Sequence, residues 1–238
     1  MSMGIKGYLA MTAAEFSKAS HIGTPAWMSC HFSPWGTGLT NLPIALPQGS
    51  MVILDDRYTP DVHDMETVKN QMQELCRHLK PACILLDFQR PKNPKAAEIA
   101  HALISILPCS VGISQQYAHG FTCPVLVDCP HPSSSLQSSV AAFAGRELWL
   151  ELAPEQQRLT LTETGCHITE EALSQLSTPH FFDAETASCY HWTLSQKKAT
   201  FYVQRDLDCL QKLLLQAEKL GITRAVGLYQ QLGGDFFQ

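Results

Sequence analysis

The chain has 238 residues, enough for two small domains or for one α/β barrel, since barrels of this kind run to about 250 residues. Hydrophobic residues make up 45% of it and charged residues 16%, which is typical of a compact globular protein. The formal net charge is −5 and the Lys and Arg residues are scattered, so nucleic acid is not expected as a partner. No window approaches the roughly 20 apolar residues that cross a bilayer, so no membrane is expected either.

Short apolar runs that resemble strands alternate with helical patterns along most of the chain, which favours a parallel sheet. Helices are clearest at Met65–Leu79, at Pro94–Ile106 and at Leu207–Leu220, the last of which follows the predicted N-cap residue Asp206 and ends before Gly221. The eight candidate strands are Lys6–Met11, Ala26–Phe32, Met51–Asp55, Cys83–Phe88, Ser110–Ser114, Val125–Asp128, Glu147–Leu152 and Ala225–Gln230.

The alternation breaks between Thr160 and Val203. We therefore expect an α/β fold of the (β/α)8 TIM-barrel type, forming a single domain over residues 1–238, with a late antiparallel β insertion around residues 159–205 before the last helix. The insertion is predicted to hold a short strand at Leu159–Thr162, an irregular loop at Pro179–Phe182, and a hairpin of Tyr190–Leu194 and Ala199–Val203.

Polar residues gather where the predicted strands end, and in (β/α)8 barrels this end, the barrel mouth, carries the chemistry. The fourth strand runs out at Asp87, Gln89 and Arg90. Strand alternation places Leu85, Asp87 and Gln89 on the inner face. Asp87 and Gln89 are therefore expected to point into the same mouth as catalytic or ligand-binding groups. The alternative is that Asp87 only pairs with Arg90 or Arg57.

Other strand ends add candidates. Glu151, at the end of the seventh strand, is the one glutamate in such a position and could act as a displaced catalytic acid. Trp35 could stack on a ligand or equally pack as a loop anchor. The Asp55-Asp56-Arg57 triplet could belong to the site or form only a solvated cluster of ion pairs. The further candidates for ligand binding are Trp35, Asp55, Arg57, Gln115, Asp128 and Tyr229.

The stretch Ala82–Pro91 resembles the signature strand of the family 18 glycoside hydrolases, the chitinase group, whose pattern is D-G-x-D-x-D-x-E-x-P. Asp87 stands at the third Asp and Gln89 at the Glu, whereas Ala82 and Leu85 replace the first two Asp residues. The closing segments Phe201–Asp206, Leu220–Ile222 and Ala225–Tyr229 are also similar to that family. There Tyr229 takes the place of a floor aromatic that is normally Trp.

The resemblance implies hydrolysis in which the Glu is the general acid and the substrate's own acetamido group is the nucleophile, oriented by the neighbouring Asp. An amide is not an acid at accessible pH, and general acid catalysis contributes ~10²–10⁴-fold. Standard chitinase turnover is therefore expected to be very weak or absent. Gln89 can still hydrogen-bond a sugar oxygen as donor and acceptor.

No metal and no cofactor are expected. There is no H-x-H on the first strand, no H-E-x-x-H, and no glycine-rich nucleotide motif. The nine cysteines are odd in number and lack a C-x-x-C pair, and the N-terminus lacks the apolar core of a secretory signal. A reduced chain in the cytoplasm is the expectation.

Three functions stay open at this point. The first is a catalytically degenerate barrel that binds a carbohydrate or another polar small molecule. The second is an active glycoside or other hydrolase that uses Glu151 or the Asp55/Asp56 pair. The third is a non-catalytic scaffold or interaction barrel, favoured by the apolar residues Ala82 and Leu85 where acids would stand. Pocket volume should discriminate, since a working site offers roughly 300–1,000 Å³.

Overall fold

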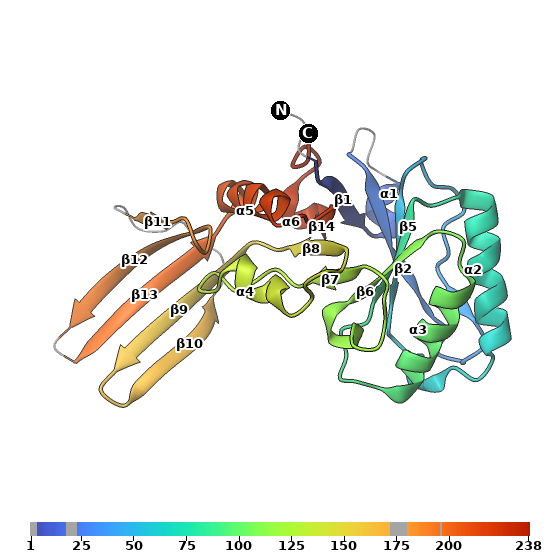
Figure 1. Ribbon diagram of the computed structural model, residues 1–238, viewed down its shortest axis with the longest axis horizontal. Coiled ribbons are helices and arrows are strands. Elements are labelled where there is room, and N and C mark those ends of the chain that lie inside the picture. Colours follow the sequence, from blue (N-terminus) through green and yellow to red (C-terminus); the bar gives the residue numbers. More distant parts are fainter. Residues whose placement is uncertain (1–3, 18–22, 172–179, 196) are drawn as a thin grey trace.

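The computed structural model describes residues 4–17, 23–171, 180–195 and 197–238. Its main body is a closed barrel of eight parallel strands that pair in chain order, the first with the last (Figure 1). The predicted (β/α)8 barrel with an antiparallel insertion is thereby confirmed. The barrel strands are β1 (Lys6–Met11), β2 (Pro25–Phe32), β4 (Met51–Asp55), β5 (Cys83–Asp87), β6 (Ser110–Ser114), β7 (Val125–Val127), β8 (Leu148–Leu152) and β14 (Arg224–Leu228).

Three long helices pack around the barrel: α2 (Met65–Leu79), α3 (Pro94–Ile106) and α5 (Leu207–Lys219). Their starts follow from side-chain capping, because Asp64 Oδ1 accepts a hydrogen bond of 2.9 Å from the amide of Thr67 and Asp206 Oδ1 one of 2.9 Å from that of Cys209. In the described residues, the other segments between and after the barrel strands contain a two-residue strand and short helices: β3 (Leu39–Thr40), α1 (Ala13–Phe16), η1 (Thr59–Asp61), η2 (Gln115–Tyr117), α4 (Leu136–Ala141) and α6 (Tyr229–Leu232). None of the helices in the described ranges is long and apolar enough to cross a lipid bilayer.

Strand alternation divides the core into two clusters, as expected for a barrel. The outer cluster joins the outward faces of the strands to the helices, and it includes Leu86 and Phe88. The inner cluster fills the barrel around the fully buried ring of Trp149, which has room because Gly112 on β6 carries no side chain. The inner cluster consists of Tyr8, Ala10, Ala26, Met51, Ile53, Cys83, Leu85, Leu126, Trp149 and Val226.

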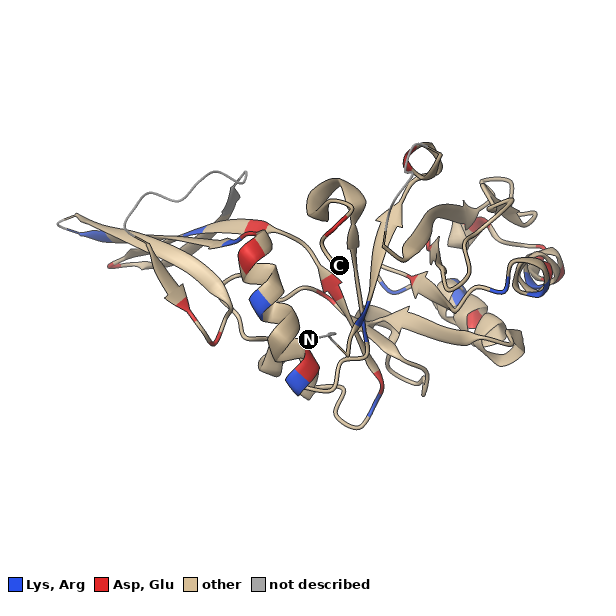
Figure 2. Ribbon diagram, turned by 90° about the horizontal axis from the view of Figure 1, so that it is seen from above, with Lys and Arg blue, Asp and Glu red and all other residues tan. Residues whose placement is uncertain are grey.

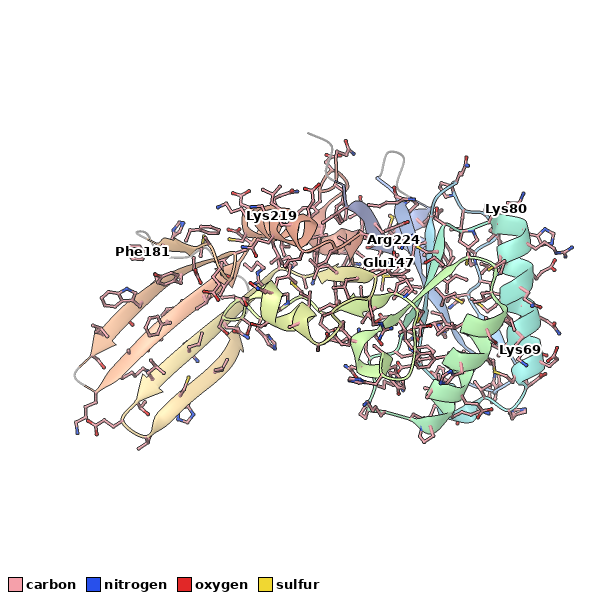
Figure 3. The ribbon with its side chains drawn as sticks, in the orientation of Figure 1. Lys69, Lys80, Glu147, Phe181, Lys219 and Arg224 are labelled. Carbon is pink, nitrogen blue, oxygen red and sulfur yellow. The ribbon has the colours of Figure 1, made fainter. Side chains whose placement is uncertain are left out.

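An ion pair closes the barrel at the amino ends of the strands. Arg224 Nη1 lies 2.5 Å from Glu147 Oε1, and Figure 3 shows the two residues side by side. The guanidinium of Arg224 also lies 4.6 Å from the centre of the Trp149 ring, whose Nε1 donates to Glu147 at 3.0 Å. This end of the barrel is therefore sealed by a compensated pair of charges.

The insertion forms a separate five-stranded antiparallel sheet that extends away from the barrel (Figure 1). The predicted hairpin is present, but the strand predicted at Leu159 begins at Glu155, and Phe181–Asp183 is a strand where a loop was predicted. Pro179 lies outside the described residues. In spatial order the strands are β10 (Gly165–Glu171), β9 (Glu155–Thr162), β13 (Lys198–Arg205), β12 (Ser188–Ser195) and β11 (Phe181–Asp183).

Arg205, the last residue of β13, holds this sheet to the barrel. Its side chain is fully buried and donates to the carbonyl oxygens of Pro130, of His131 at 3.4 Å and of Thr186 at 2.6 Å. Because a buried guanidinium needs several acceptors to offset its lost hydration, these carbonyls fix where the sheet leaves the barrel.

Two pairs of cysteines bring their sulfur atoms close together without forming a disulfide bond. Sγ of Cys189 lies 3.6 Å from Sγ of Cys209, and Sγ of Cys76 lies 3.9 Å from Sγ of Cys109. All nine thiols are free. Whether the chain is kept reduced where it works stays a prediction.

Gly112→Ala tests the packing of the inner cluster. A Cβ at this position would stand 2.4 Å from a ring carbon of Trp149. Overpacking a filled core costs about 1–3 kcal/mol, so we expect the free energy of unfolding in a urea titration to fall by that amount. Gly23→Ala is the control, because its Cβ would meet nothing nearer than 4.0 Å and should change stability by less than about 0.5 kcal/mol. Equal losses in both variants would contradict this account of the core.

Candidate carboxylate site at the barrel mouth

The carboxyl ends of the barrel strands surround a cavity of about 120 Å³. Three of its lining residues are acidic, and the remaining ones are apolar. The volume is below the roughly 300–1,000 Å³ expected of a working small-molecule site. The lining residues are Ala10, Met28, Ile53, Asp55, Leu85, Asp87, Leu126, Glu151, Val226, Gly227 and Leu228.

Asp87 reaches the cavity from the end of β5. Leu85, two residues earlier, belongs to the inner cluster and also lines the cavity, which confirms the predicted inward face of this strand. Burial raises the pKa of Asp87 to about 6, against a hydrogen bond from Gln89 that lowers it, and the charges of Asp56, Asp55 and Asp128 raise it further. Asp55 stands directly beside Asp87 in the parallel register of β4 and β5.

Glu151 reaches the same cavity from β8. Burial raises its pKa to about 7, and the negative charges of Asp87 and Asp128 add to the shift. No described residue donates a hydrogen bond to its carboxyl group. Near neutral pH the Asp87 and Glu151 carboxyls therefore divide between protonated and ionised forms, so this part of the mouth can give or take a proton.

Asp128 and Gln115 form a pair beside the cavity. Gln115 Nε2 donates to Asp128 Oδ2, whereas Oδ1 of Asp128 is buried without a partner among the described residues. Burial raises the pKa of Asp128. The two predicted residues are thus brought together, but neither lines the cavity itself.

Gln89 lies at the rim of the mouth and is exposed. Its Nε2 donates a hydrogen bond of 2.7 Å to Asp87 Oδ1, and its Oε1 accepts one of 3.2 Å from Gln116. The residue at the position of the family's acid therefore holds Asp87 in place and is absent from the cavity lining.

The Asp55-Asp56-Arg57 triplet is split by the end of β4. Asp55 lines the cavity and accepts from the amide of Arg57 at 2.8 Å, with the exposed guanidinium of Arg57 at 3.5 Å. Asp56 is buried elsewhere and accepts from the amide of Arg90 at 2.8 Å. The structure therefore does not bring Asp55 and Asp56 together as a carboxylate pair in the cavity.

Two predicted aromatic groups lie outside the cavity lining. Trp35 is 79% exposed on the loop after β2. Tyr229 does not stand in the last strand, which ends at Leu228. It begins α6 and packs against the outer cluster, so Leu228 takes the lining position instead. The turn into α6 rotates Tyr229 away from the mouth.

Met28 and Leu228 are lining residues that the sequence analysis did not single out. Leu228 could have been found from the alternation of its strand, since Val226 is also inward. Met28 could not, because the register of β2 against β4 shifts between Trp27 and Cys30 and breaks the alternation there. Within the described ranges, no group of three or more His, Cys, Asp or Glu side chains is arranged to hold a metal ion.

The fold is that of the family 18 glycoside hydrolases, at low sequence identity. The spore cortex-lytic enzyme SleL of Bacillus cereus superposes with a TM-score of 0.62 and 9% identity over 98% of this chain and 72% of that one. The family 18 chitinase of Cycas revoluta, solved in complex with (GlcNAc)3, superposes with a TM-score of 0.55 and 11% identity over 97% of this chain and 96% of the chitinase. The chitinase-like agglutinin of Robinia pseudoacacia superposes with a TM-score of 0.52 and 11% identity over 94% of each chain. No family model matches the sequence, and no curated protein matches it.

The raised pKa values predict how stability depends on pH. The folded pKa of Glu151 is about 7 and its ordinary value 4.5, so the unfolded chain loses this proton first as the pH rises. Stability should therefore fall between about pH 4.5 and pH 7 and level off above, and Glu151→Gln should stabilise the protein at pH 8 by on the order of 1–2 kcal/mol. Urea titrations from pH 4.5 to 8.5 measure this.

Glu163→Gln, at an exposed turn, is the control and should leave the pH profile unchanged. Parallel profiles for the wild type and Glu151→Gln would contradict the burial of this carboxyl.

Proposed function

We propose that the barrel mouth binds part of a neutral carbohydrate and that turnover by the chitinase mechanism is absent or very weak. The observation that carries this proposal is the position of Gln89. Gln89 is an amide at the position where the family's sequence pattern has its acid. It lies on the rim, and its Nε2 donates to Asp87. The fold shared with chitinases and with a chitinase-like agglutinin supports a carbohydrate as the ligand class.

The charges of the mouth restrict the ligand further. Asp55, Asp87 and Glu151 line the cavity, and the nearby guanidinium of Arg57 is exposed beside Asp55 alone. An anionic ligand would bring a like charge toward carboxylates in a poorly hydrated site, which is strongly unfavourable. Hydroxyl and amide donors match carboxylate acceptors, so a neutral sugar fits and a uronic acid or sugar phosphate does not.

The volume restricts how much of the ligand enters. At about 120 Å³ the cavity is too small to enclose a typical ligand, so only a substituent or one edge of a sugar ring would be buried. The remainder would lie on the rim, where the Gln89 and Gln116 side chains are joined at 3.2 Å. We therefore expect weak binding that depends on both Asp87 and Gln89.

A thermal-shift series tests this proposal with N-acetylglucosamine, its di-, tri- and tetramers, and neutral monosaccharides. A ligand present at ~100 times its dissociation constant should stabilise the protein by about 2.7 kcal/mol. We expect a neutral N-acetylglucosamine oligomer to raise the melting temperature, Gln89→Ala to weaken that response at least tenfold in concentration, and galacturonic acid oligomers to have no effect.

Gln73→Ala, an exposed glutamine on α2, is the matched control and should respond like the wild type. A blank across the neutral sugars would overturn the proposal and leave a non-catalytic scaffold barrel as the better account.

One observation favours a second candidate, an active hydrolase in which Glu151 is the acid. A general acid works best when its pKa is near the operating pH, and that of Glu151 is raised to about 7 beside Asp87. On this account a fluorogenic N-acetylglucosamine disaccharide is cleaved at a rate that falls as the pH rises through about 7. Glu151→Gln would then lose ~10²–10⁴-fold while Gln89→Ala keeps most of the rate. No release by the wild type at any pH would exclude this candidate for that substrate.

A further inference from the structure

The projecting sheet has one face that is almost entirely apolar. The pairing register places the side chains of Trp192, Phe201, Leu159 and Ile168 in one row across four strands. Leu194, Ala199, Leu161 and Cys166 form the next row. Phe181, Tyr190 and Val203 extend the face toward the barrel, in a row that continues with Gln157 and Glu170. We call the eleven apolar residues of these rows the apolar sheet face.

The opposite face of the same sheet is polar. Thr193, Thr200, Thr160 and His167 form one of its rows, between rows that hold Tyr202 with Arg158 and Lys198 with Thr162. Successive side chains along each strand point to opposite faces of the sheet, so apolar and polar residues alternate in the sequence. Such a pattern is typical of a sheet with one side in water and the other against a packing partner.

The apolar sheet face is exposed in the chain alone. Trp192 is 48%, Ile168 59% and Leu194 68% exposed, and Phe181, which Figure 3 shows on the projecting sheet, is exposed as well. A hollow of about 300 Å³ opens on this face, lined mainly by Leu159, Leu161, Tyr190, Phe201 and Val203. Large contiguous apolar patches on a folded protein mark interaction sites.

Size and charge indicate what covers this face. Four strands of seven to eight residues at about 3.3 Å per residue and about 4.8 Å spacing, with the three-residue β11 at the edge, give a face of roughly 500 Å². Two such faces in contact bury about 1,000 Å², the smallest area expected of a biological interface. Figure 2 shows both acidic and basic residues along the strands of the projecting sheet, but none of the eleven residues of the apolar sheet face is charged, and Asp183 at the edge is the only charged member of the hollow's lining. The register places one charged residue on this side of the sheet, Glu170 on the edge strand β10. A face with so little charge is complementary to itself, whereas an anionic membrane or a charged partner would require basic residues around it.

We propose that the apolar sheet face is covered by the same face of a second copy of this chain, forming a two-fold symmetric dimer. Two antiparallel sheets then pack face to face about 10 Å apart, as in a β-sandwich. A two-fold axis through the face brings the same surface from both copies, so one apolar patch suffices for both sides. The interface uses no residue of the barrel mouth, so this proposal stands independently of sugar binding.

Sedimentation velocity of the full chain over about 1–100 µM tests the proposal. We expect the wild type to be a dimer of 52.8 kDa, twice the chain mass of 26.4 kDa, in the upper part of this range. Leu194→Lys and Trp192→Lys each place a charge on the apolar sheet face and should weaken dimerisation at least 100-fold, giving monomers throughout. Circular dichroism confirms that both variants are folded.

Thr193→Lys is the matched control, since Thr193 is an exposed neighbour on the same strand but on the polar face. It should remain as dimeric as the wild type. A monomeric wild type at 100 µM, a dimer that survives both lysine variants, or equal dissociation by Thr193→Lys would each overturn the proposal. A monomer that binds phosphatidylcholine vesicles would overturn it in favour of a lipid surface.

Discussion

Carboxylates buried without matching cations are the constraint around which this barrel is arranged. Closing eight parallel strands in register points the last inward residues of β4, β5 and β8 into one small space. Asp55, Asp87 and Glu151 therefore share a cavity whose other walls are apolar. For Asp87 and Glu151, desolvation and mutual repulsion both disfavour ionisation and raise the pKa, so these two carboxyl groups are partly protonated near neutral pH. Charge is compensated at the opposite end, where Arg224 pairs with Glu147.

The same constraint explains why the amide at Gln89 matters. Gln89 donates to the ionised form of Asp87 and so opposes the shift that burial imposes. A glutamate there would add another negative charge to a mouth that already holds several, unless it stayed protonated. The carboxyl groups of raised pKa are those of Asp87 and Glu151, and neither stands at the position that the family's pattern gives to its acid. Binding without standard turnover, or turnover through a different acid, are the two chemistries that this arrangement allows.

Local sequence pattern was enough for the barrel but not for the whole site. Strands such as Met51–Asp55 and Ser110–Ser114, and the helix Met65–Leu79, were predicted to the residue because apolar periodicity and capping residues act locally. Asp87 was placed correctly for the same reason. β10 was missed because its sequence, Gly165–Glu171, mixes glycine, histidine and acidic residues and forms a strand through pairing with β9. The positions of Trp35, Tyr229 and Asp56 relative to the cavity could not be predicted, because the direction of each side chain depends on how a loop leaves its strand, which no sequence period encodes.

The projecting sheet differs from the barrel in how its faces are covered. The barrel buries both faces of its sheet, inside against Trp149 and outside against the helices, so it needs no further cover. The insertion has a single layer, attached at its base through the carbonyl contacts of Arg205. A stable domain needs at least two packed layers around an apolar core, and in the described residues this sheet supplies one. A second copy would provide the missing layer on the apolar sheet face, which contains no residue of the carboxylate mouth, so the mouth of each barrel would stay open to its own ligand.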